Sequence, residues 1–240
     1  MKKLFALLLV AAMLVSLVSC SANNSNSKEA FDTSKEAFKE TTQAYILVNE
    51  FSMDIYEAWR LGINEKSDYN DDYELDDFAS ELNVDSSSIK EAIASLLKKD
   101  SYQSGDWKTL QYFYSSFFSA CVSVVSEAYI VNGTANKIEN LLKSAMENMK
   151  TLDDQYSDYT HYPYLKSYFT NTLAFFDFCK DPEGSFEQVV ETFNQYRNNA
   201  RTYFFELNYV FENNINGMDS FINKNEEETG SSTGNETIVY

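Results

Sequence analysis

The chain has 240 residues, of which 44% are hydrophobic and 15% aromatic, so it holds enough apolar material for one sizeable core. Its 19 basic and 37 acidic residues give a net charge of −18, which disfavours nucleic acid as a partner because phosphate binding needs a basic face. The 7 Gly and 2 Pro are too few for a turn-dense all-β chain or a Rossmann-type chain. The single His excludes a metal site built from several histidines, and we expect no cofactor.

The first nineteen residues have the pattern of a secretory signal peptide. Lys2 and Lys3 form a positively charged start, and an apolar run from Leu4 to Val18 follows, interrupted only by Ser16. The run is too short, and its flanks too weak, for a lasting membrane span. We therefore expect residues 1–19 to direct export and to be removed.

Leu17-Val18-Ser19-Cys20 resembles the lipobox of bacterial lipoproteins, in which a cysteine follows an aliphatic, a small or aliphatic, and a small residue. This resemblance implies that the Cys20 thiol is acylated, that cleavage occurs just before it, and that Cys20 becomes the first residue. Two or three acyl chains would anchor the protein stably, since each buried methylene contributes about 0.8 kcal/mol. The expected location is the outer face of a bacterial membrane, either at the cell surface or in the periplasm.

Processing changes the charge and creates a tether. Loss of two lysines from a chain of net charge −18 leaves the mature protein at −20, so anionic head groups repel it and the lipid must hold it at the membrane. Residues 20–27, the acylated cysteine and a polar stretch, are predicted to be a short tether.

The period of apolar residues in the mature chain is close to 3.6, which predicts helices throughout. The first is expected over residues 28–61 with Gly62 as its C-terminal stop, and a short one over 88–99 with Ser88 and Glu91 as a capping box. Between them, residues 64–87 are predicted to be a solvated acidic linker.

Two long helices are predicted next, over residues 106–131 and 134–156. Asp106 is the expected N-cap of the first, and Asn132-Gly133 ends it. Thr134 is expected to cap the second. Because the connection is so short, the spacing predicts an antiparallel hairpin.

The last two helices are expected over residues 163–179, with Pro163 in the first turn, and over 185–216, with Ser185 and Gln188 as a capping box and Gly217 as the stop. The polar, acidic residues 223–240 are predicted to be a disordered tail. The sequence therefore predicts one all-α domain over residues 28–222: an antiparallel, up-and-down bundle of five or six helices without a β-sheet.

The acidic linker contains an incomplete calcium-binding pattern. Asp68, Asn70 and Asp72 have the spacing that opens a calcium loop, which would make the domain a calcium-stabilised surface module. However, Tyr73 replaces the glycine of the sharp turn and Ala79 replaces the bidentate glutamate. We favour a solvated linker and predict no metal site.

Residues 109–126 carry no charge, which raises the alternative of a membrane-active protein that inserts this segment. Five serines within it favour a central bundle helix instead.

Cys121 and Cys179 lie on the apolar faces of two predicted helices. A disulfide would form between them if these helices are neighbours, but two buried thiols are the preferred interpretation.

Weak candidates for ligand binding lie further along the chain. Arg197 and Arg201 are one helical turn apart and would clamp an anion, although such pairs more often contact acids on a neighbouring helix. Tyr159, Tyr162 and Tyr164 would line an aromatic groove for sugar or peptide, although packing is the more common role.

Two patterns that suggest catalysis do not hold. Residues 230–234 match G-x-S-x-G, but they lie in the predicted tail and the only histidine, His161, precedes them. His161 itself is expected at a helix start. We therefore expect no catalytic residues and a non-enzymatic protein.

The segment ETTQAYILVNEFSMDIYEAW, residues 40–59, resembles the first helix of YiiG-like bacterial lipoproteins, which also share the layout of lipobox, tether, helical bundle and polar tail. This family has no assigned activity, so the resemblance implies a fold and no functional residues. The expected function is that of an envelope lipoprotein whose bundle binds another envelope protein or a small ligand.

Overall fold

A computed structural model describes the backbone of residues 2–64, 75–99 and 117–211, and the side chains within residues 28–63, 78–97 and 119–211. In these residues the structure is all-α, with seven helices and no strand. The helices are α1 (Lys2–Asn64), α2 (Leu75–Ser80), α3 (Ser86–Lys99), α5 (Phe117–Val131), α6 (Thr134–Gln155), α7 (Tyr162–Lys180) and α8 (Phe186–Phe211).

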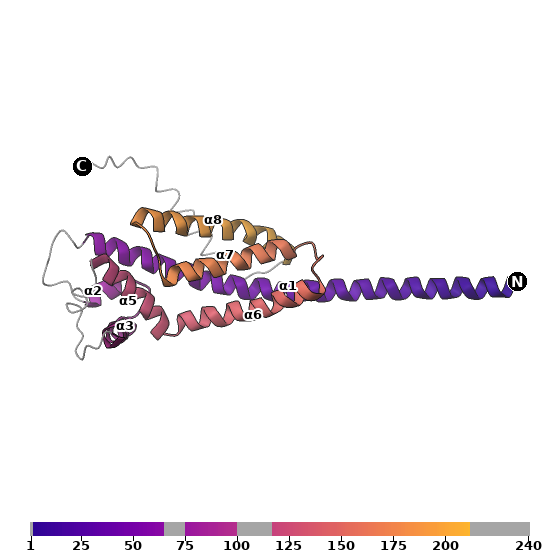
Figure 1. The fold of residues 1–240 in the computed structure, drawn as a ribbon, viewed down its shortest axis with the longest axis horizontal. Coiled ribbons are helices and arrows are strands. Elements are labelled where there is room, and N and C mark those ends of the chain that lie inside the picture. The colour runs from indigo at the N-terminus through magenta and orange to yellow at the C-terminus, as the bar shows by residue number, and fades with distance from the viewer. Residues whose placement is uncertain (1, 65–74, 100–116, 212–240) are drawn as a thin grey trace.

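Helix α1 is the axis of the bundle. Its 63 residues span about 95 Å at 1.5 Å per residue, and its N-terminal part extends beyond the other helices (Figure 1). The other helices surround its C-terminal half, where residues on several sides are buried. These include Phe38, Thr41, Tyr45, Val48, Phe51, Ser52, Asp54 and Ile55.

Helices α5 and α6 lie along α1 one after the other, so the predicted hairpin between them is wrong. Three hydrogen bonds mark successive levels of α1: Tyr129 to Asp54, Ser144 to Glu40 and Tyr156 to Glu29. As α5 and then α6 advance, their partners on α1 move steadily back toward its N-terminus. The short link at Asn132-Gly133 bends one rod that runs antiparallel to α1; it does not reverse the chain.

Helices α7 and α8 complete the up-and-down order. Helix α7 runs parallel to α1, because Tyr168 packs on Phe38 whereas Cys179, eleven residues later, lies beside Val48. Helix α8 returns: Phe186 packs on Tyr56 near its start, and Phe211 packs on Phe31 at its end. The order is thus α1 up, α5 and α6 down, α7 up and α8 down, which confirms the predicted antiparallel, up-and-down bundle.

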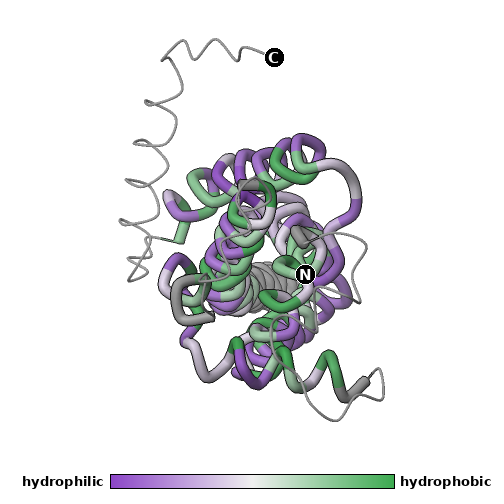
Figure 2. The backbone as a smooth tube through the Cα atoms, turned by 90° about the vertical axis from the view of Figure 1, so that its left-hand side faces the viewer, coloured by the Kyte–Doolittle hydropathy of each residue, from purple (hydrophilic) through white to green (hydrophobic). Residues whose placement is uncertain are grey.

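Several predicted helix ends agree with the structure. Ser185 and Gln188 form the predicted capping box: the Ser185 N–H donates to Gln188 Oε1 at 2.8 Å, and the Gln188 N–H donates to Ser185 Oγ at 3.4 Å. Gly133, with φ of 80°, separates α5 from α6 as predicted, although Asn132 accepts the Thr134 N–H in place of a Thr134 cap. Figure 2, viewed along the long axis, shows hydrophilic and hydrophobic residues alternating along the helices, as amphipathic helices require.

Helix α1 exceeds its prediction at both ends. Its backbone is helical through residues 20–27, predicted to be a tether, because this stretch has no glycine or proline to stop a helix that is already nucleated. It also continues two residues past Gly62, which is buried. A glycine costs a helix about 1 kcal/mol, and packing of its buried neighbours Leu61, Trp59 and Ala58 offsets that cost.

Part of the predicted acidic linker packs into the bundle. Phe78, Leu82 and Val84 are buried, and the short helix α2 was not predicted because its acidic neighbours conceal these apolar residues in the sequence. The next helix begins at Ser86 instead of Ser88. Asp85 is its cap, accepting the Ser88 N–H at 3.0 Å, so the predicted Ser88–Glu91 capping box is wrong.

Candidate functional site

The sequence-derived arginine candidates contact different partners. Arg197 reaches inward to α1, where its Nε donates to Asn49 Oδ1 at 2.9 Å and its NH2 group donates to Ser52 Oγ at 2.8 Å. Arg201, one turn further along α8, lies over the ring of Phe205 at 5.6 Å. The two guanidinium groups therefore take part in separate contacts, and Arg197 links α8 to α1.

The tyrosine candidates also differ in their surroundings. Tyr162 is buried and donates its hydroxyl to Asp153 at 2.7 Å. Tyr159 is half-buried against the edge of His161, at 5.5 Å between ring centroids, and Tyr164 is half-exposed at the surface. The Tyr162 ring and hydroxyl are thus already used in packing and in a hydrogen bond.

Other candidates fall wholly or partly outside the described residues. Asp68, Asn70 and Asp72 lie in the segment 65–74, and the stretch 230–234 lies in the segment 212–240. The backbone of Cys20 lies in α1, but its side chain is outside the described set. In the described residues, no three His, Cys, Asp or Glu side chains gather closely enough to hold a metal ion.

The two cysteines of the bundle are both buried free thiols, as the preferred interpretation predicted. Burial raises the pKa of the Cys179 thiol, which keeps it protonated and unreactive. Of the stretch 109–126, residues 109–116 lie outside the described part. A search of the described residues found no helix with the length and hydrophobicity that crossing a membrane requires.

A buried carboxylate that the sequence did not single out joins three elements of the bundle. Asp54, 1% exposed on α1, accepts hydrogen bonds from the backbone and side-chain amides of Asn83 at 3.1 and 3.0 Å, and from the Tyr129 hydroxyl at 2.8 Å. Burial raises the pKa of Asp54, and these hydrogen bonds oppose the rise by stabilising the charged form. Each of its oxygens is occupied by protein groups, so the cluster holds the fold together.

A surface hollow lies between α1 and α6, and we call it the α1–α6 groove. Its volume is about 770 Å³, within the range of small-molecule sites. Its lining combines an apolar floor with polar walls. The residues are Glu40, Gln43, Ile46, Leu47, Gly133, Asn136, Lys137, Asn140, Leu141 and Ser144.

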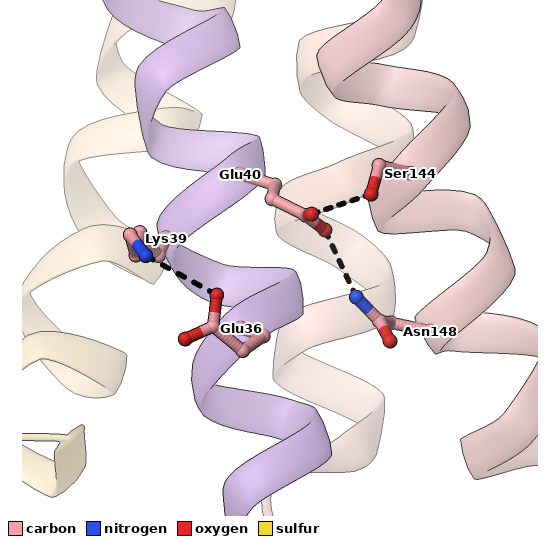
Figure 3. A network of polar contacts seen from close by, with 5 residues as sticks. All are labelled: Glu36, Lys39, Glu40, Ser144 and Asn148. Carbon is pink, nitrogen blue, oxygen red and sulfur yellow. Dashed lines mark hydrogen bonds and ion pairs between the residues drawn. The ribbon is translucent and has the colours of Figure 1, made fainter.

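One end of this groove is closed by a polar contact between the two helices. Glu40 points from α1 toward α6, where its carboxylate accepts hydrogen bonds from the Ser144 hydroxyl and from Asn148 Nδ2, the latter at 2.9 Å (Figure 3). The ion pair of Glu36 and Lys39 lies on another side of α1. Neutral donors therefore orient the Glu40 carboxylate and leave its negative charge in place.

Another hollow, about 380 Å³, lies where α5 meets the ends of α1 and α7. Trp59, Leu96 and Pro182 form apolar parts of its wall, and the buried Glu127 carboxylate, which accepts a hydrogen bond from Ser95, forms a polar part. It is half the size of the α1–α6 groove.

Comparison with known proteins found no family model that matches the chain, and no curated protein or solved structure with significant similarity.

Sequence reasoning missed the α1–α6 groove. A local signal exists, since Asn136 and Asn140 are four residues apart on one face of a helix, with Lys137 beside them. That signal does not reveal the opposite wall, because Gln43 and Glu40 are about a hundred residues earlier in the chain. Leu141 is apolar but only half-buried, and it lines the groove.

Proposed function

We propose that the protein is a lipoprotein of the bacterial envelope, anchored through acyl chains on Cys20, and that its helical bundle is a non-enzymatic module that binds a ligand. The lipobox pattern at residues 17–20, after a charged start and an apolar run, carries the first part of the proposal. The layout of YiiG-like lipoproteins, which the chain resembles, agrees with it.

The arrangement of polar groups supports the binding role. The buried Asp54 and the half-buried Arg197 are used in hydrogen bonds that join helices, which is a structural use. In the α1–α6 groove Glu40 also joins two helices, but there, by contrast, further polar side chains lie at the surface beside partly exposed apolar ones, as in ligand sites. This contrast makes the groove the best candidate for the working surface.

Metabolic labelling tests the anchor. The full chain is expressed in a bacterial host with radiolabelled palmitate, and we expect label in the membrane fraction. Cys20→Ser should abolish the label and leave an unprocessed precursor, while the matched control Cys121→Ser should keep it. Label retained in Cys20→Ser, or a mature N-terminus other than Cys20 by mass spectrometry, would refute the proposal.

A further inference from the structure

The α1–α6 groove has opposite charges at its two ends. Glu40 lines one end and Lys137 lines the other. Among the described residues, no cationic group lies within 4 Å of the Glu40 carboxylate, and no acidic group lies that close to the Lys137 ammonium. Both Glu40 oxygens accept hydrogen bonds from α6, but these donors are neutral, so the negative charge of Glu40, like the positive charge of Lys137, has no counter-charge in this part of the chain.

The helical register sets how far apart the two residues are along the groove. Glu40 is hydrogen-bonded to Ser144, and Lys137 precedes Ser144 by seven residues on α6. Seven residues of α-helix rise by about 10.5 Å. The start of α6 at Gly133 lies beyond Lys137, and the positive end of the helix dipole adds to the positive potential there.

The walls between the two charges match an amide backbone. Three carboxamides, those of Gln43, Asn136 and Asn140, line the groove. Each can donate and accept at the same time, which is what a peptide group requires of its partner. Half-buried aliphatic side chains form the floor: Ile46, Leu47 and Leu141.

We propose that the α1–α6 groove binds a short, extended peptide of three or four residues with both termini free. The peptide's ammonium group contacts Glu40, its carboxylate contacts Lys137, and small apolar side chains rest on the floor. An extended chain advances about 3.3–3.5 Å per residue, so three residues cover about 10 Å, which is close to the rise of α6 between Lys137 and Ser144, the hydrogen-bond partner of Glu40. This inference rests on the ligand-binding role proposed above and names the ligand's chemistry.

The separation of charge favours this ligand over a neutral one. A neutral oligosaccharide of the same length would pair with the carboxamides but would leave both terminal charges of the groove without a counter-charge. A peptide with free termini supplies one opposite charge at each end, so charge complementarity also sets its direction in the groove.

Calorimetry on the full chain, purified in detergent, tests the proposal with Ala-Ala-Ala as the probe. We expect a dissociation constant on the order of 0.1–1 mM, as suits a small ligand in an open groove. Acetylation of the amino terminus or amidation of the carboxyl terminus should each weaken binding by about fivefold, because each removes one exposed ion pair. Ala-Ala should bind more weakly than Ala-Ala-Ala, and a neutral trisaccharide should bind more weakly still.

Variants assign each terminus to its end of the groove. Glu40→Gln should weaken Ala-Ala-Ala by about fivefold and leave the acetylated peptide unchanged. Lys137→Met should weaken Ala-Ala-Ala equally and leave the amidated peptide unchanged. Lys143→Met and Glu147→Gln are matched controls, since both residues are exposed on α6 outside the groove lining, and both should bind like the wild type.

Three outcomes would overturn the inference: no binding of Ala-Ala-Ala at 10 mM, equal binding of free and capped peptides, or tighter binding of the neutral trisaccharide. The capping experiment uses the wild type alone, so it stays decisive even if a variant fails to fold. Labelling at Cys20 is independent of all these measurements, so failure of the peptide would leave the anchoring proposal standing.

Discussion

The hydrogen bond from Tyr129 to Asp54 offers the sharpest test of how the bundle is held together. Tyr129→Phe removes one hydroxyl that lies 2.8 Å from a carboxylate that is 1% exposed. The ring itself stays, stacked on Phe51 with centroids 4.1 Å apart and planes inclined by 13°. The substitution thus isolates the hydrogen bond from the packing.

The expected cost follows from the charge and burial of the acceptor. A hydrogen bond to a charged group contributes about 1.5–3 kcal/mol, and its loss leaves a buried oxygen of Asp54 with one donor fewer. We therefore expect the free energy of unfolding to fall by about 2 kcal/mol at pH 7. For a protein of this size, that corresponds to a decrease in Tm of about 4–8 °C.

The effect should depend on pH. Burial raises the pKa of Asp54, so between the pKa of the unfolded chain and that of the folded protein the carboxyl group is protonated only in the folded protein. As pH rises through this window, the group destabilises the fold progressively. Tyr129→Phe removes a hydrogen bond that lowers this pKa, so the pKa should rise further. Below the window the carboxyl is neutral and the cost of the substitution should shrink.

Urea unfolding followed by circular dichroism measures the free energy, and carbon NMR of the Asp54 carboxyl follows its titration. Tyr209→Phe is the matched control, because Tyr209 is 89% exposed and its hydroxyl contributes little. A loss of less than 0.5 kcal/mol in Tyr129→Phe at pH 7, or a loss that stays constant while the Asp54 carboxyl becomes protonated, would refute the reasoning.

Three further predictions concern the links between helices. Arg197→Met removes the hydrogen bonds from α8 to α1 and should lower the free energy of unfolding by about 1–2 kcal/mol; a value near zero in urea unfolding would contradict the inward role of this side chain. Gly133→Ala should lower the free energy of unfolding, measured by thermal unfolding, by about 1–2 kcal/mol, because φ at this position is 80°. No atom lies within 4 Å of the added Cβ, so backbone strain and not a steric clash causes the loss. Gly133→Asn should lower it less, since asparagine tolerates this backbone conformation better. Asp85→Ala should lower Tm by removing the cap of α3. Because hydrogen bonds from Ser87 and Ser88 lower the pKa of Asp85, that loss should be full above the ordinary value of 3.8 and should fade as pH falls below it.

Local signals in the sequence predicted the fold class and many helix ends. The capping pair Ser185 and Gln188 and the glycine at 133 act within one turn of chain, so their effect can be read without knowing the partners. The apolar seams also predicted which faces are buried, because a helix face is set by a period of 3.6 residues alone.

Local signals failed where distant residues decide the outcome. Gly62 lies inside α1 because packing there outweighs a helix-breaking preference, and the acidic residues around Phe78 hide a segment whose apolar side chains are buried. The short link at Gly133 predicts a reversal of the chain, but such a link shows only that the helix direction changes there. The angle between α5 and α6 is decided by the contacts of both helices with α1.

By itself, the sequence determined an acidic chain that is all-α in the part that the structure describes, because composition and apolar period are properties of neighbouring positions. The lipobox before Cys20 is a local pattern too, and the lipid anchor that it indicates stays a prediction. Only the tertiary structure decided that α1 is the axis, that α5 and α6 form one bent rod, and that Glu40 and Lys137 line one groove. The physical reason is that these features depend on which helix faces which. That choice is made by packing between residues about a hundred positions apart, which no local pattern records.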